Sequence, residues 1–143
     1  MLTLAFRTRL GPMSLGTESI SAITFFTGDM ASSTSFYEAL GFRVLFGGPT
    51  APFTSLGGLP VDDDPTHFVN LQLEPGFRQA GLWGRVIFHT PDLAGVDATH
   101  DAAVAAGYRP EAPPADAPWG ERYFHIRDPS GHELSFACRL AGH

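Results

Sequence analysis

Two stretches of the chain share one order of apolar and polar positions. Ile23–Met30 reads Ile-Thr-Phe-Phe-Thr-Gly-Asp-Met, and Val86–Leu93 reads Val-Ile-Phe-His-Thr-Pro-Asp-Leu. In each stretch an apolar run typical of a strand leads to an aspartate, Asp29 or Asp92, whose carboxylate can accept the free amide hydrogens of a helix's first turn. An internal repeat of this kind predicts two modules built to one plan.

Each predicted strand is followed by an amphipathic pattern that indicates a helix. We expect helices over residues 30–40 and 93–106, each ended by a glycine, Gly41 or Gly107, in the left-handed conformation. The residues expected on the apolar helix faces are Phe36, Tyr37 and Leu40 in the first, and Leu93, Val96, Ala103 and Val104 in the second.

Three further strands are expected in each module, which gives the order β-α-β-β-β twice. They are predicted at residues 42–46, 52–56 and 67–73, and at residues 108–111, 122–127 and 133–138. Asp128-Pro129-Ser130-Gly131 is a strong turn sequence between the last two. The predicted organisation is a flexible tail (1–18) and one domain (19–141), with modules at 19–74 and 83–141 and a linker at 75–82.

Composition narrows the classes of function. The 143 residues suit a single domain, and the net charge of -6 disfavours nucleic acid and would attract a cationic ligand. All nine basic residues are arginines, which excludes a lysine Schiff base, and Cys138 is the only cysteine, so no internal disulfide can form. No apolar run approaches the length of a membrane span, and we expect a cytoplasmic protein.

The segment Pro118–Phe136 contains Pro-Trp-Gly, Arg122 and the Asp-Pro-Ser-Gly turn, and Phe36–Phe42 reads Phe-Tyr-Glu-Ala-Leu-Gly-Phe. With the repeat, these motifs resemble the vicinal-oxygen-chelate superfamily of glyoxalases, bleomycin-resistance proteins and extradiol dioxygenases. The resemblance covers about residues 20–139. It implies an α+β fold in which two βαβββ modules form a curled mixed-sheet cup.

The metal-dependent families of that superfamily bind a divalent cation with two residues from each module. Counting from the aspartates and from the turn places those positions at Ala22, Asn70, Arg85 and Ser135. Alanine has no donor atom, arginine is cationic, and serine and asparagine are poor lone ligands. We therefore expect no metal and no cofactor. The pattern is closest to the metal-free, antibiotic-binding, bleomycin-resistance-like branch.

Side chains alternate between the two faces of a strand, which divides the residues further. Residues that share a strand face with the four ligand positions should point into the cup, and they include aromatic, polar and charged side chains. Residues on the opposite strand face are apolar and should pack under the helices. The expected ligand-binding residues are Phe26, Phe68, Asn70, Gln72, Arg85, His89, Trp119, Tyr123, His125, Glu133 and Ser135. The apolar set is Ile23, Phe25, Val69, Leu71, Val86, Phe88, Phe124, Ile126, Leu134, Phe136 and Cys138.

Several of these residues also have ordinary structural interpretations. Arg85 and Glu133 can simply pair across the cup, and His89 and His125 can be hydrogen-bonded structural histidines. Trp119 is expected on a loop at the lip of the cup or against a neighbouring subunit. Trp83 is expected to anchor the linker, and Asp62–Asp64 to form a solvated loop.

Two functions follow from this pattern. The first is a binding protein that sequesters an antibiotic or related natural product, aromatic or peptide-like and possibly cationic, at or near the interface of a homodimer. The second is an enzyme, a lyase, isomerase or dioxygenase, with either a metal site displaced to His89, His125 and Glu133 or metal-free acid–base chemistry by the same residues.

Overall fold

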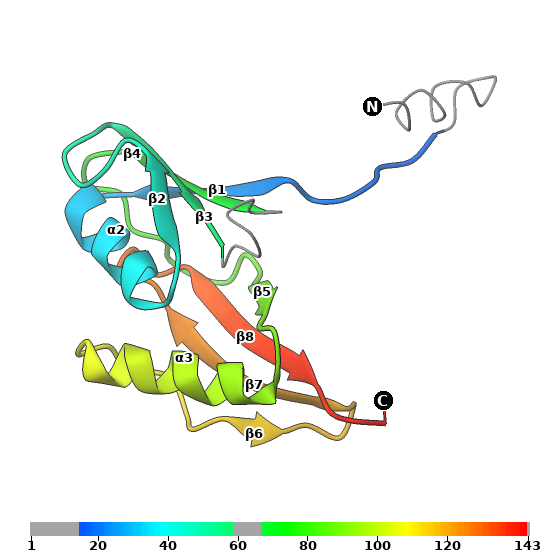
Figure 1. Cartoon of the computed structure of the whole chain (residues 1–143). Coiled ribbons are helices and arrows are strands. Elements are labelled where there is room, and N and C mark those ends of the chain that lie inside the picture. The colour runs from blue at the N-terminus through cyan, green and yellow to red at the C-terminus, as the bar shows by residue number, and fades with distance from the viewer. Residues whose placement is uncertain (1–14, 59–66, 143) are drawn as a thin grey trace.

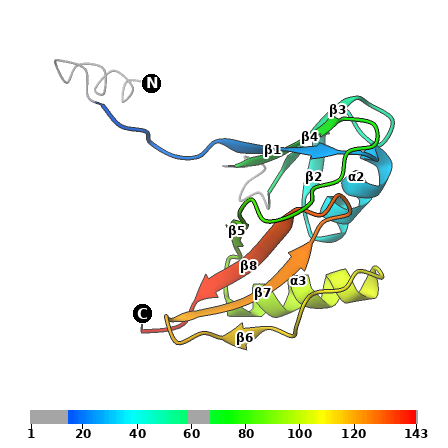
Figure 2. The ribbon, with the colours of Figure 1, turned by 180° about the vertical axis from the view of Figure 1, so that it is seen from behind.

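The computed structural model describes residues 15–58 and 67–142. The expectations for the first fourteen residues and for Asp62–Asp64 lie outside these ranges. Residues 15–21 form no helix or strand, and the first of them extend away from the body of the molecule (Figures 1 and 2). Ser21 already lies against the first sheet, where its carbonyl accepts a 3.0 Å hydrogen bond from the amide of Phe68.

The two modules have one topology. The first contains β1 (Ala22–Thr27), α2 (Met30–Ala39), β2 (Arg43–Phe46), β3 (Phe53–Gly57) and β4 (Phe68–Leu73). The second contains β5 (Val86–His89), α3 (Leu93–Ala105), β6 (Ala115–Asp116), β7 (Glu121–Arg127) and β8 (Glu133–Arg139). The strand orders are β1-β4-β3-β2 and β5-β8-β7-β6, and the first and last strands of each module pair in parallel. The predicted α+β fold of two βαβββ modules is confirmed.

The helices begin and end where the sequence predicts. Asp29 accepts a hydrogen bond from the amide of Ser32 at 3.1 Å, and Asp92 accepts one from the amide of Gly95 at 2.8 Å. Gly41 and Gly107 follow the helices with φ of 100° and 94°. Glycine adopts these positive angles easily because it has no side chain to clash with the backbone. Each helix therefore stops within one residue of its predicted end.

One strand was predicted in the wrong place. Residues 108–111 are irregular, and the edge strand β6 lies at Ala115–Asp116 instead. Proline has no amide hydrogen to donate, and Pro110, Pro113 and Pro114 interrupt this segment. Only Glu111 reaches the sheet there, through a 2.9 Å hydrogen bond from its amide to the carbonyl of His125.

The apolar set forms one core shared by both modules. Phe36 of the first module packs edge-on against Tyr108 of the second, with ring centroids 4.9 Å apart, and Phe42 packs in the same way against Phe88 at 5.2 Å. Most members of the set are buried, while Ile23, Val86 and Cys138 pack partly buried against it. Val104 is 52% exposed, so its prediction as a core-facing helix residue was wrong.

The Asp128 turn joins the modules. Asp128 accepts a 2.7 Å hydrogen bond from the hydroxyl of Tyr37 and two 2.9 Å bonds from the amides of Ser130 and His132. The Ser130 hydroxyl donates to Thr27 at 3.0 Å. Burial raises the pKa of Asp128, and burial together with the neighbouring Asp128 raises the pKa of Tyr37. A segment expected to be only a turn is therefore a buried connection between modules.

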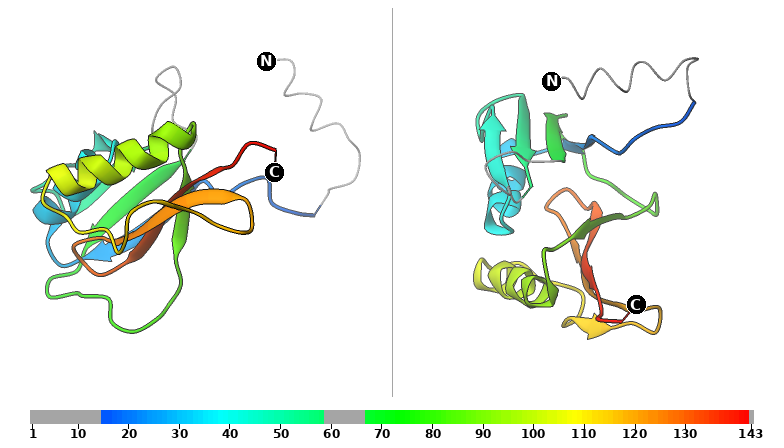
Figure 3. Two further views of the ribbon diagram at one scale, coloured as in Figure 1. Left: turned by 90° about the horizontal axis from the view of Figure 1, so that it is seen from below. Right: turned by 45° about the vertical axis from the view of Figure 1, so that its right-hand side comes forward.

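Both helices lie on one side of the molecule, with β5 and β8 on the other (Figure 3, right). The faces of the strands away from the helices carry large exposed apolar side chains, including Phe26, Phe46 and Ile87. Within the described residues, no helix has the length and hydropathy needed to cross a membrane.

Candidate functional site

The open face of the second sheet, which is the face away from α3, has a buried carboxylate where β8 begins. Glu133 opens β8, and only 9% of its side chain is exposed. One oxygen accepts a 3.0 Å hydrogen bond from Arg85, and the other accepts a 3.2 Å bond from Arg127. The structure thus confirms the predicted Arg85–Glu133 pair and adds Arg127, which lies opposite Glu133 in the β7–β8 register. Both oxygens of Glu133 are used within the protein.

His125 and Ser135 occupy the next position on the same two strands. They pair in register, and Nδ1 of His125 lies 2.6 Å from the hydroxyl oxygen of Ser135. Burial lowers the pKa of His125, and the positive charge of Arg85 lowers it further, whereas Glu111 and Glu133 raise it. The result is an imidazole that favours its neutral form. Ser135 is 2% exposed, so its hydroxyl is a partner for His125 and not an accessible nucleophile.

A row of aromatic rings runs along β7 toward these residues. Trp119 stacks on Tyr123 with ring centroids 5.7 Å apart, and Tyr123 lies 4.9 Å from His125. The indole of Trp119 donates a 3.1 Å hydrogen bond to Glu121, which also lies 3.5 Å from Nε2 of His89. Trp119 is 66% exposed, and its position at the lip of a ligand site stays a prediction.

The open face of the first sheet is less connected. The side-chain amide of Asn70 donates a weak 3.3 Å hydrogen bond to Thr24, its neighbour in the β1–β4 register. Phe26 is 42% exposed and lies against Phe77 of the linker, with ring centroids 5.9 Å apart. Gln72 pairs with Phe26 in register and is also exposed. These groups form no chemical cluster of their own.

A cavity of about 750 Å³ lies between the beginning of β1 and β4 in the first module and β5 in the second. It brings together four of the predicted positions from the two modules: Ala22, Phe68, Arg85 and His89. The other predicted ligand-binding residues do not line it. They lie further along the sheets, outside the cavity. Glu121 lines the cavity and also contacts His89 and Trp119, so it connects the cavity with the row of aromatic rings.

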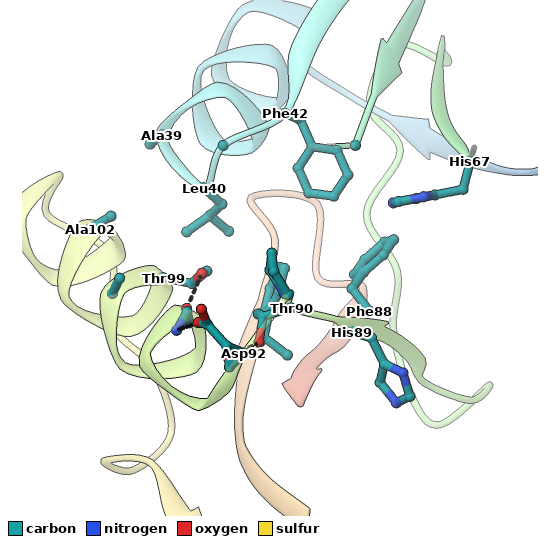
Figure 4. Close-up of a pocket in the computed structure, with 16 residues that line it drawn as sticks. Ala39, Leu40, Phe42, His67, Phe88, His89, Thr90, Asp92, Thr99 and Ala102 are labelled. Carbon is teal, nitrogen blue, oxygen red and sulfur yellow. Dashed lines mark hydrogen bonds between the residues drawn. The ribbon is translucent and has the colours of Figure 1, made fainter. Parts of the chain in front are cut away.

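The sequence did not predict a second cavity, which lies on the helix side. It has a volume of about 510 Å³, and Figure 4 shows Leu40, just after α2, and Thr99 of α3 facing it from opposite sides. His89 is the one predicted site residue in its lining, and its ring points away from Leu40. The signal that could have indicated this space is the small side chains at the facing helix ends, Ala39 and Ala102.

The residues at the expected metal positions do not fit a divalent cation. Ala22 offers no donor, Arg85 is held on Glu133, and Ser135 is held on His125. The alternative set of His89, His125 and Glu133 is not assembled either, since each pairs with a different partner. Within residues 15–58 and 67–142, no group of three or more His, Cys, Asp or Glu is arranged to hold a metal ion.

Two modules that each place one helix behind a four-stranded sheet define the class of protein, the vicinal-oxygen-chelate fold. The family model for the "Glyoxalase/Bleomycin resistance protein/Dioxygenase superfamily" matches residues 19–136, and the chain belongs to this superfamily. Among curated proteins, none matches the chain significantly in sequence.

Solved structures with the same fold have different names. A glyoxalase/bleomycin resistance protein/dioxygenase from Nocardioides is 20% identical, with a TM-score of 0.65 over 99% of this chain and 95% of that one. TioX from Micromonospora sp. ML1 is 24% identical, with a TM-score of 0.63 over 86% and 100%. Lactoylglutathione lyase from Agrobacterium tumefaciens is 17% identical, with a TM-score of 0.63 over 85% and 93%. At these identities the likeness concerns the fold alone.

Proposed function

We propose that the protein binds a small natural product, such as an antibiotic, on its open sheet faces without metal and without converting it. The observation that carries this proposal is the set of side chains at the superfamily's metal positions. Ala22 cannot coordinate a cation, and Arg85 and Ser135 already have partners within the protein. The metal-free, bleomycin-resistance-like branch is the part of the superfamily that this pattern fits best.

The open faces offer what a large aromatic or peptide-like ligand needs. Exposed rings such as Trp119 and Phe26 supply stacking surfaces, while Asn70, Gln72 and Tyr123 supply polar groups that can orient a ligand. The cavity of about 750 Å³ lies within the size range of small-molecule sites. In this proposal the protein acts by keeping the compound from its target.

The metal-free part of the proposal is tested by elemental analysis. Protein purified without chelators should contain far less than one equivalent of zinc, nickel, iron or manganese. Near-stoichiometric metal would contradict this part, because it would require a donor set other than the four expected positions.

The ligand is sought by a thermal-shift screen of natural products and metal ions. A compound that binds only the folded state raises the melting temperature in proportion to its affinity and concentration. An antibiotic that shifts the melting temperature should also be tested in cells, where protection should scale with the amount of protein, as sequestration requires. A screen in which no compound shifts the melting temperature while a metal ion does would count against the proposal.

Metal-free catalysis is the second candidate, and the His125–Ser135 contact favours it. A neutral imidazole on the open face can act as a general base, and Glu133 and His89 are the other candidates in that region. The two functions differ in turnover. A confirmed ligand incubated with a catalytic amount of protein should be recovered unchanged by mass spectrometry, whereas many equivalents of a modified product would identify an enzyme.

A further inference from the structure

The cluster of Arg85, Glu133 and Arg127 has hydrogen-bond donors to spare. Arg85 uses only one terminal nitrogen, Nη2, on Glu133. Its Nε and other terminal nitrogen make no hydrogen bond to any residue that the structure describes. Arg127 donates to Glu133 and to the carbonyl of Gly131. The two arginine side chains remain 39% and 51% exposed, so their outer edges face the solvent side of the sheet.

The charges of this cluster do not cancel. One buried carboxylate lies between two guanidinium groups, which leaves one positive charge on the cluster itself. His125 beside them favours its neutral form. The carboxylates of Glu111 and Glu121 lie outside the cluster, the first acting on His125 and the second in contact with Trp119 and His89. The net charge of -6 is spread over the whole chain. In about 0.1 M salt, charges more than about 10 Å from a bound ligand are largely screened from it. A direct guanidinium–oxyanion contact is short and bidentate and is therefore much less affected.

The aromatic row leads to this positive group. Tyr123, His125 and Arg127 lie on the same face of β7, and each is about 7 Å along the strand from the next. A flat ring system that stacks on Trp119 and Tyr123 and extends past His125 would bring a substituent at its far end to the arginines. A cation at that end would meet two guanidinium groups of like charge, and Glu133, the one carboxylate between them, already shares its charge with both.

We propose that this face binds an aromatic molecule that carries an oxyanion, a carboxylate or a phosphate, with its rings on Trp119 and Tyr123 and its oxyanion on Arg85 and Arg127. The inference rests on the proposed small-molecule site and specifies its ligand. It replaces the cationic ligand expected from the acidic composition, since Glu133, the buried acid on this face, is already paired with two arginines.

The test compares probes that share one ring system, measured by calorimetry: 2-naphthoate, 2-naphthyl phosphate, 2-naphthamide and 2-naphthylmethylammonium. At least one of the two oxyanions should bind about tenfold more tightly than the amide or the cation. Which of the two binds better distinguishes a carboxylate from a phosphate as the natural group.

Three variants separate binding from stability. Arg85→Gln should reduce the affinity for the oxyanion to near that for the amide. Glu133→Gln should increase it, because the internal competitor for both guanidinium groups is removed. Arg43→Gln removes the same charge from β2 of the other module and should leave the affinity unchanged. A structural defect would weaken binding in both Arg85→Gln and Glu133→Gln, so opposite effects are specific to an oxyanion site.

The inference is overturned if the amide or the cation binds as tightly as the oxyanions, or if Glu133→Gln weakens oxyanion binding. Those results would leave the proposed small-molecule binding intact. Absence of binding by all four probes up to millimolar concentration would also overturn it, whereas the proposed function is decided separately by the natural-product screen.

Discussion

Burial of Glu133 is energetically costly unless its charge is paired. An ionised carboxylate that is taken out of water loses several kcal/mol of hydration, and this loss is offset only where its oxygens accept good hydrogen bonds. Arg85 and Arg127 supply one bond to each oxygen. A guanidinium therefore occupies a region in which the metal-dependent relatives are expected to hold a cation, and the same charge acts on the neighbouring His125.

The pKa of His125 should report this charge. Burial and Arg85 lower it below the ordinary 6.5 of histidine, so the unfolded state binds more protons between the two values. The contribution of His125 to stability is then fully present above pH 6.5 and is lost as the pH falls toward the lowered pKa. Arg85→Gln should raise the pKa of His125, measured by NMR titration of the ring protons. An unchanged or lower pKa in this variant would contradict the assigned cause.

Trp119 should contribute directly to ligand binding. Stacking on an indole is worth on the order of 1 kcal/mol beyond the area that it buries, so Trp119→Ala should weaken the binding of a confirmed ligand several-fold or more. Trp119→Phe keeps a ring against Tyr123 and should restore part of the affinity. If Trp119→Ala binds as well as the parent protein, Trp119 is not part of the site.

At the scale of elements, the Asp128 turn both connects β7 to β8 and holds the two modules together through its bonds to Tyr37 and Thr27. Gly131 has a φ of 95°, and a Cβ built there would lie 2.8 Å from the carbonyl oxygen of Gln79. The amide of Gln79 in turn donates to the carbonyl of Ser130 at 2.8 Å. The linker thus packs directly on the turn that joins the modules, and the turn requires glycine both for its angle and for this close approach.

Two glycine substitutions separate these two requirements. Gly107 has nearly the same φ as Gly131, but a Cβ there would meet nothing within 4 Å. Gly107→Ala should cost about 1 kcal/mol of unfolding free energy from backbone strain alone, and Gly131→Ala should cost clearly more. The measurement is urea denaturation of both variants. Equal losses would show that the linker is not held against the turn.

Local signals were sufficient for most elements but not for the contacts between modules. The aspartate N-caps, the glycines after the helices and the alternation of apolar residues depend on neighbours in sequence. These signals correctly predicted both helices and the strand residues that face the core. The edge strand was misplaced because the prolines after Arg109 move the pairing to Ala115. The bond between Tyr37 and Asp128 joins residues far apart in the sequence, so no local pattern could indicate it. The helix-side cavity had only the small side chains of Ala39 and Ala102 as a local signal. The positions assigned to the ligand site remain predictions.

At the scale of the whole molecule, the open sheet faces are too apolar for a surface that meets only water. Phe46 and Trp119 are each 66% exposed and Ile87 is 58% exposed, in addition to Phe26 on β1. Each sheet also has two edge strands with unpaired backbone groups, β1 and β2 in one and β5 and the short β6 in the other. A ligand of ordinary size can cover only part of this surface, and a second copy of the chain would cover more.

We therefore predict a homodimer formed through the open faces, with the ligand site at or near the interface. Light scattering at micromolar concentration should give twice the mass of 15.4 kDa. A charge placed in the apolar surface should oppose association because the carboxylate would have to be desolvated, so Phe46→Asp should shift the mass toward that of the monomer. Val104→Asp puts the same charge on an exposed position of α3, on the helix side, and should leave the dimer intact. A monomeric parent protein would refute the prediction, and dissociation by Val104→Asp but not by Phe46→Asp would place the interface on the helices instead.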